Sequence, residues 1–214
     1  TVIPLTVKSG TTTHFITDYY PQWEGATNLT TSDERLLLAP VTDNWEQFSI
    51  TTESNVLVST IDVWHDTECL SIVVLGGNRD AKGSFMSSTK VEDGVVTIVA
   101  SKPVVEAVAL WQNNTIGDIQ IEGNIIKIAI PSVAKEHQRS ALRIFAASES
   151  GRFNDVLLPL EDGRVVVDAV DIRRQDFQSQ ILYSLMIDRF KNGTTANDWK
   201  INSPEVLDKV DYQG

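Results

Sequence analysis

Short apolar runs rich in Val, Ile and Thr recur about every ten residues along this chain, and Gly, Asn, Asp or Ser separate them. Helical spacing of apolar residues is almost absent. This pattern is typical of antiparallel strands, so it predicts a mainly β protein. Three tripeptides supply residues that tolerate positive φ, as tight hairpins require: Glu92-Asp93-Gly94, Glu122-Gly123-Asn124 and Glu161-Asp162-Gly163.

The expected strands fall into two groups. The first group is 2–8, 12–18, 35–39, 46–51, 55–64 and 69–76, and the second is 95–101, 104–111, 117–123, 124–131, 140–148, 155–160 and 164–169. Turn-forming residues concentrate in GGNRDAKGS at 76–84, where we expect a domain boundary; a loop within one larger sandwich is the alternative. The length of 214 residues suits two domains, and the second group has the strand count of an immunoglobulin-like sandwich.

Composition excludes some classes of function. A formal charge of −11 and the lack of any Lys/Arg cluster argue against nucleic-acid binding. No apolar run approaches the roughly 18 residues of a membrane-spanning helix. The one cysteine, Cys69, cannot form an intramolecular disulfide and is expected to be a buried thiol.

Catalytic signals are weak in this chain. The adjacent carboxylates Glu161 and Asp162 fall in a predicted surface turn, and the three histidines lack the spacing of zinc ligands. We therefore predict no catalytic residue here.

Two tryptophans have the neighbours that sugar binding requires, because the apolar face of a sugar stacks on an aromatic ring while nearby amides bond its hydroxyls. Trp23 follows Tyr19-Tyr20-Pro21-Gln22, and Trp111 precedes Gln112-Asn113-Asn114. Trp23, Trp111 and Asn113 are therefore candidate carbohydrate-binding residues. The alternative is that both indoles pack inside the protein.

The stretch QILYSLMIDRFKNGTTAND, residues 180–198, breaks the alternating pattern. Ile181 to Ile187 reads as a short strand buried on both faces, as in parallel sheets. The loop after it gathers oxygens from Asn192, Thr194, Asn197 and Asp198, which suits a hard cation such as calcium. An ordinary solvated loop is the alternative.

Read together with DYQG at 211–214, this stretch resembles the start of the catalytic barrel of the α-amylase superfamily, glycoside hydrolase family 13. In that family a first barrel strand ends in Asp-Arg-Phe, an Asn-Gly-x-x-x-Asn-Asp loop follows, and Gly-Gly-Asp comes soon after. The segments TTTHFITDYYPQW at 11–23 and IPSVAKEHQRSALRIFAASESGRFNDVLLPLEDGRVVVDA at 130–169 resemble the sandwich domains that precede the barrel in Bacteroidetes-type amylases.

The resemblance implies a calcium site in the intact parent protein, formed by Asn192, Asn197, Asp198 and the carbonyl of Gly214, with Thr194 where relatives often have Asn. Because calcium takes six to eight oxygen ligands and the set is cut short here, we expect no calcium bound by this chain itself. It also implies that the catalytic Asp and Glu of the retaining mechanism lie on later barrel strands. We therefore expect this chain to be inactive by itself and its parent protein to be an enzyme. The parent is expected to be secreted, periplasmic or on the cell surface, with its signal peptide removed.

The expected organisation is two tandem immunoglobulin-like β-sandwiches at 1–82 and 83–174, followed at 175–214 by the beginning of a (β/α)8 barrel. The expected partners are α-glucans and the chain's own catalytic barrel. The sandwiches either bind glucan or serve as structural modules that shape the catalytic cleft. The alternative is a complete surface-adhesion or carbohydrate-binding protein unrelated to amylases.

Overall fold

The computed structural model describes residues 4–16, 26–41, 45, 47–53, 55–92 and 94–167. All of them belong to one compact unit, residues 1–172. Within them the regular structure consists of strands and one short 3-10 helix, so the predicted mainly β fold is confirmed. In this part of the chain no helix has the length and apolar character needed to cross a membrane.

Among the described residues, the first sandwich has seven strands: β1 (Leu5–Thr6), β2 (Thr12–Ile16), β3 (Asn28–Thr30), β4 (Leu36–Pro40), β5 (Gln47–Thr52), β6 (Val58–His65) and β7 (Glu68–Leu75). One sheet has the order β1-β7-β6-β3 and the other β2-β5-β4. Most neighbours are antiparallel, but β1 pairs with β7 in parallel.

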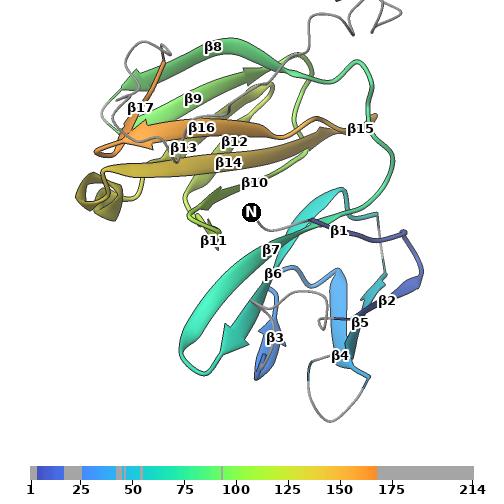
Figure 1. Ribbon diagram of the computed structural model, residues 1–214. Helices are drawn as coiled ribbons and strands as arrows, with labels where there is room; N and C mark the ends of the chain where they lie inside the picture. The colour runs from blue at the N-terminus through green and yellow to red at the C-terminus, as the bar shows by residue number, and fades with distance from the viewer. Residues whose placement is uncertain are drawn as a thin grey trace, which may run out of the picture. The chain divides into compact units, whose positions relative to one another are not determined.

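The second sandwich contains ten strands and the 3-10 helix: β8 (Phe85–Glu92), β9 (Val95–Ala100), β10 (Glu106–Trp111), β11 (Asn114–Thr115), β12 (Ile119–Glu122), β13 (Ile125–Ala129), η2 (Ser132–Glu136), β14 (Arg139–Ser148), β15 (Gly151–Arg152), β16 (Val156–Glu161) and β17 (Arg164–Val165). Its sheets have the orders β12-β13-β9-β8 and β11-β10-β14-β16-β17, with β15 beside β14. Figure 1 shows β8 and β9 in one layer and β14 and β16 in the other.

Each sandwich encloses its own apolar core, because alternate residues of a strand point to the same face of the sheet. The first core includes Phe48 and Ile50 from β5 and Ile61, Val63, Ile72 and Val74 from β6 and β7. The second core includes Val96 and Ile98 from β9, Ile126 and Ile128 from β13, and Leu142, Ile144 and Ala146 from β14. The two groups of expected strands therefore correspond to two separate cores.

The turn predictions are confirmed by the backbone. Gly94 and Gly123 have φ of 77° and 62°, and Asp162 and Gly163 have φ of 48° and 74°. The segment 76–84 lies between β7 and β8. The boundary after residue 82 stays a prediction, and the barrel start at 175–214 lies outside the described residues.

Four strands, β3, β8, β11 and β15, and the helix were not expected from the pattern. The three-residue β3 contains a single apolar residue, Leu29, and Ser87-Ser88 interrupts the apolar alternation of β8. The 3-10 helix follows Pro131, whose φ is −56°. The proline ring fixes this angle near the helical value, which helps to begin the turn.

Replacing Ile144 in the second core should lower stability much more than replacing an exposed leucine. Ile144 is fully buried, whereas Leu37 on β4 is 48% exposed. We expect Ile144→Ala to lower the free energy of unfolding by about 2–5 kcal/mol through lost burial and a residual cavity, and Leu37→Ala by less than about 1 kcal/mol. Urea unfolding monitored by tryptophan fluorescence measures both. Equal losses would contradict the assignment of the core.

Candidate functional site

The outer faces of two sheets meet at an apolar junction between the sandwiches. In β7, Ile72 and Val74 face the first core, so Val73 faces away from it; in β14, Phe145 faces away from the second core in the same way. The full junction consists of Leu57, Val58, Val73, Leu75, Val108, Leu110, Phe145 and Ala147. Burial of these side chains favours association of the two sheet faces.

The carboxylate of Glu106, at the start of β10, is the main polar contact across this junction. Its Oε2 accepts hydrogen bonds from the backbone N–H groups of Leu57 (2.9 Å) and Val58 (2.7 Å). Its Oε1 accepts one from Nη1 of Arg35 (2.5 Å). The Glu106 side chain is only 17% exposed. Hydrogen bonds to a buried charged group are stronger than neutral ones, so one residue of the second sandwich holds the entry to β6 in place.

Arg35 is itself held by Asp33 in a two-pronged ion pair. Arg35 donates from Nε to Oδ1 of Asp33 at 2.8 Å and from Nη2 to Oδ2 at 2.7 Å. The hydrogen bonds from Arg35 lower the pKa of Asp33 from 3.8 to about 2, and the same pair raises the pKa of Arg35. The guanidinium is therefore fixed in the orientation that Glu106 requires.

A second polar contact joins β7 to the turn between β10 and β11. The backbone N–H of Ser71 donates to the carbonyl of Asn113 (2.8 Å), and the N–H of Thr115 donates to Oγ of Ser71 (3.0 Å). The turn residues Gln112 and Asn113 have φ of 50° and 64°, which is the geometry of a type I′ hairpin. The turn is thus anchored by its backbone, and its two amide side chains are left to face outward.

The third contact lies in the connecting segment 76–84. Asp80 is buried and accepts hydrogen bonds from Nζ of Lys102 (2.6 Å) and Oγ of Ser150 (2.9 Å). These hydrogen bonds, that of Lys102 first, lower the pKa of Asp80. Gly151 has a φ of 133°, and a Cβ there would lie 2.5 Å from the carbonyl oxygen of Asn78. Glycine therefore lets the connecting segment lie directly against β15.

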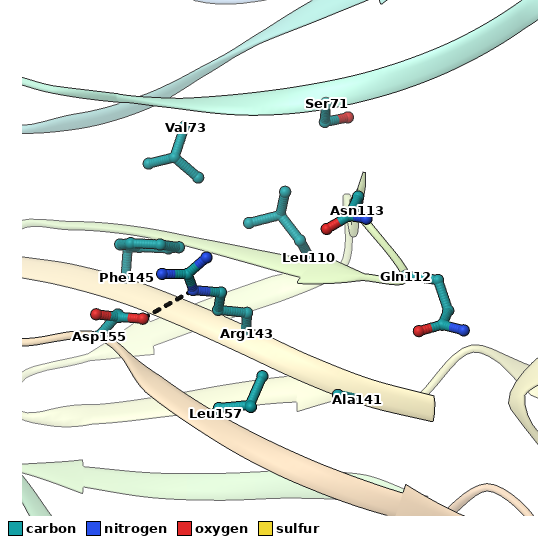
Figure 2. A pocket seen from close by; sticks show the side chains of 10 residues that line it. All are labelled: Ser71, Val73, Leu110, Gln112, Asn113, Ala141, Arg143, Phe145, Asp155 and Leu157. Carbon is teal, nitrogen blue, oxygen red and sulfur yellow. Dashed lines mark hydrogen bonds and ion pairs between the residues drawn. The ribbon is translucent and has the colours of Figure 1, made fainter. Parts of the chain in front are cut away.

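Between these contacts a cavity of about 430 Å³ opens beside the junction. Val73, Leu110, Phe145 and Leu157 supply its apolar wall, and Ser71, Gln112, Asn113, Arg143 and Asp155 supply its polar groups. Figure 2 shows Arg143 close to Asp155, with Phe145 beside it and Gln112 and Asn113 grouped at the turn. Nε of Arg143 donates to Oδ2 of Asp155 at 2.8 Å, and its guanidinium lies 4.9 Å from the centre of the Phe145 ring. Small-molecule sites commonly combine a mostly apolar wall with a few polar groups in this way.

The structure separates two of the sugar-binding candidates. Asn113 lines the cavity, but Trp111 packs against the second core and lies edge-on to His137, with ring centres 5.1 Å apart. Trp111 also borders a different pocket, of about 310 Å³, with Ile116 and Pro131. Trp111 is the last residue of β10, whereas Asn113 sits in the I′ turn itself, and the two residues line different pockets. The role of both in sugar binding stays a prediction.

Several other candidates lie outside the described residues: Trp23 and the calcium ligands Asn192, Asn197, Asp198 and Gly214. In the part of the chain that is described, no group of three His, Cys, Asp or Glu side chains is placed to hold a metal ion. Cys69 is half-buried rather than buried, and desolvation, with Asp62 nearby, raises its pKa.

Sequence reasoning did not identify Arg143, Asp155 or Leu157 as site residues. One signal was present for Arg143, because it interrupts the apolar run SALRIFAAS on β14. A charged residue in the middle of such a strand must face away from the core or have a buried partner. Asp155 precedes β16 and meets Arg143 only through the antiparallel pairing of β14 with β16.

No family model matches the chain, and no curated protein matches it. Among solved structures, the I9–I11 tandem from titin is similar to this chain. The alignment covers 74% of this chain and 62% of the tandem, with 11% sequence identity and a TM-score of 0.27. The N-terminal Ig1-2 module of the Drosophila receptor protein tyrosine phosphatase DLAR is also similar. That alignment covers 74% of this chain and 93% of the module, with 10% sequence identity and a TM-score of 0.26.

A third similar structure is Bacteroides ovatus SGBP-B of a mixed-linkage glucan utilization locus, in complex with a mixed-linkage heptasaccharide. It aligns with 76% of this chain and 41% of its own at 12% identity and a TM-score of 0.22. At these TM-scores none of the likenesses carries an argument about function.

Removing the Glu106 carboxylate should destabilise the protein strongly, because it leaves two buried N–H groups without an acceptor. We expect Glu106→Ala to lower the free energy of unfolding by about 2–5 kcal/mol. Glu106→Gln, which keeps one acceptor oxygen, should cost less. The matched control is Glu122→Ala, which removes an exposed ion pair with Lys127 and should change stability by less than about 0.5 kcal/mol. Urea midpoints compare the variants, and equal effects for Glu106→Ala and Glu122→Ala would contradict the role of Glu106.

The ion pair of Asp33 should contribute stability above pH 3.8 and lose it as the pH falls toward 2. Because the folded pKa is about 2 and the unfolded value is 3.8, the unfolded chain takes up the proton first as the pH falls. The difference in unfolding free energy between the native protein and Asp33→Asn should be about 1–2 kcal/mol above this range and shrink through it. Thermal unfolding across a pH series measures it. A difference that stays constant from neutral pH to pH 2 would contradict the assignment.

Proposed function

We propose that this chain is the N-terminal, non-catalytic portion of an α-amylase-like, retaining glycoside hydrolase that acts on α-glucans such as starch and maltodextrins. The support comes from the sequence: ILYSLMIDRFKNGTTAND followed by DYQG resembles the first strand and metal loop of the family's barrel. In the whole protein, calcium held through Asn192, Asn197 and Asp198 would bind the loop to the barrel. We expect the whole protein to be secreted, periplasmic or located on the cell surface.

Within that protein we assign the two sandwiches a structural role, as one rigid block that supports the catalytic barrel and helps to shape its cleft. The observation that carries this assignment is the Glu106 carboxylate, which bonds two backbone N–H groups and Arg35 across the junction. Modules that move independently keep polar surfaces that water can solvate in any arrangement. A junction closed by apolar burial and by charge-assisted hydrogen bonds to two backbone N–H groups instead favours a single arrangement.

The glucan-binding role of Trp111 has less support than the structural role. Its ring packs against the second core, so part of its apolar surface is already used. The immunoglobulin-like character of the sandwiches fits either role. A complete surface-adhesion protein is the remaining alternative, and the natural coding sequence beyond residue 214 distinguishes it, because the amylase proposal requires Asp directly after a further Gly.

The proposal predicts how activity divides between this chain and the longer natural protein. The 214-residue chain should release no reducing sugar from soluble starch above a buffer control, because the retaining mechanism needs two carboxyl groups about 5 Å apart on later barrel strands. The natural protein continued through the barrel should hydrolyse starch, and calcium chelation or Asp198→Asn should lower its activity or thermal stability.

A deletion tests the structural role separately. Removing residues 1–82 from the natural protein should lower its melting temperature or alter its preference for substrate length while leaving hydrolysis of a short maltodextrin intact. Starch hydrolysis by the isolated chain, or the absence of any hydrolysis by the continued protein, would overturn the proposal.

A further inference from the structure

The cavity beside the junction has the chemistry of a binding site that neither the sandwich fold nor the structural role explains. We propose that it binds a neutral saccharide of one or two rings. Its volume of about 430 Å³ lies at the small end of the roughly 300–1,000 Å³ that small-molecule sites occupy. The residues that line the cavity support this assignment whether or not the parent protein is α-amylase-like.

The apolar wall includes a large side chain that the fold does not bury. Leu157 is 61% exposed, although Val156, Leu158 and Leu160 of the same strand pack against the second core. Leu157 is paired with Arg143 across the β14–β16 ladder, and it faces the cavity together with Leu110. The C–H face of a sugar ring would cover Leu157 and remove its apolar surface from water.

The amides of Gln112 and Asn113 supply the polar side of the cavity. The backbone that carries them is held in place, because the Asn113 carbonyl accepts from the N–H of Ser71 and both residues sit in a tight I′ turn. Each amide presents donors and an acceptor, which match a sugar hydroxyl that both donates and accepts. A turn that is already ordered loses little conformational entropy when a ligand binds.

The charges in the cavity select a neutral ligand. Arg143 and Asp155 are 2.8 Å apart and compensate one another, and the remaining lining residues are uncharged. An anion would approach a chain whose formal charge is −11, and a cation would meet an Asp155 carboxylate that is already paired with Arg143. A hydroxyl-rich neutral ligand bonds both members of the pair without disturbing their balance.

Titration of the 15N-labelled 214-residue chain with maltose tests the proposal. The side-chain amide signals of Gln112 and Asn113 should shift as maltose is added. We expect an apparent Kd on the order of 1 mM, because a small site with few hydrogen bonds binds weakly. Asn113→Gly keeps the left-handed backbone and removes the amide, and it should weaken binding about fivefold, the worth of one hydrogen bond. Asp66→Gly is the matched control: it has a φ of 53° in the β6–β7 turn, does not line the cavity, and should leave binding unchanged.

A second variant tests the charge argument. Asp155→Asn keeps the shape of the side chain but removes the charge that balances Arg143, so it should bind anionic maltobionate more tightly than the native chain does and maltose less tightly. Circular dichroism confirms that each variant is folded.

The proposal is overturned if no cavity signal shifts at roughly 10 mM maltose, ten times the expected Kd. It is also overturned if the shifts lie at Trp111 and Ile116 instead, or if the native chain prefers maltobionate. Because the readout is binding by this chain, it is independent of starch hydrolysis by the longer protein.

Discussion

The junction between the sandwiches depends on one carboxylate. Leu57 and Val58 are buried in the apolar junction, and their backbone N–H groups donate to the Glu106 carboxylate. Glu106 supplies the acceptor, and Arg35 compensates its negative charge. Arg35 also forms an ion pair with a second carboxylate, that of Asp33. The apolar faces of β7 and β14 can therefore be buried together without an unsatisfied polar group, which otherwise costs about 1–3 kcal/mol.

The cavity is a consequence of this arrangement. Val73 and Ser71 belong to the first sandwich, whereas Leu110, Phe145 and Arg143 belong to the second, so the cavity wall exists only while the junction is closed. The contact between Ser71 and the Asn113 turn fixes one edge of the wall, and the Arg143–Asp155 pair fixes another. A site whose walls are held by structural contacts is ordered before any ligand arrives.

The strands and turns could be predicted from the sequence because they depend on neighbouring residues. Alternation placed β9 and β13 correctly, and Asp162-Gly163 identified its own hairpin through the backbone freedom of glycine. The short β3 escaped prediction because three residues with one apolar side chain give no periodic signal.

The candidate site could not be predicted in the same way, because its contacts join distant residues. Glu106 lies in the ordinary strand sequence VVEAVALW, and its partners are 48, 49 and 71 residues away. Trp111 ends β10 and packs against the second core, whereas Asn113, two residues later, lies in the I′ turn and lines the cavity. Proximity along a chain therefore does not by itself predict a shared site where a strand passes into a turn.

The polar contacts also explain why the junction has one register rather than several. The free energy of apolar burial changes little when two smooth faces slide by a fraction of a residue, because it follows the buried area. Hydrogen bonds weaken steeply when the distance or angle changes by that amount. Glu106 and Ser71 take part in hydrogen bonds between the two sandwiches at separate points, and Asp80 bonds the connecting segment to the second sandwich. Apolar burial therefore supplies the attraction, and these directional contacts select the arrangement.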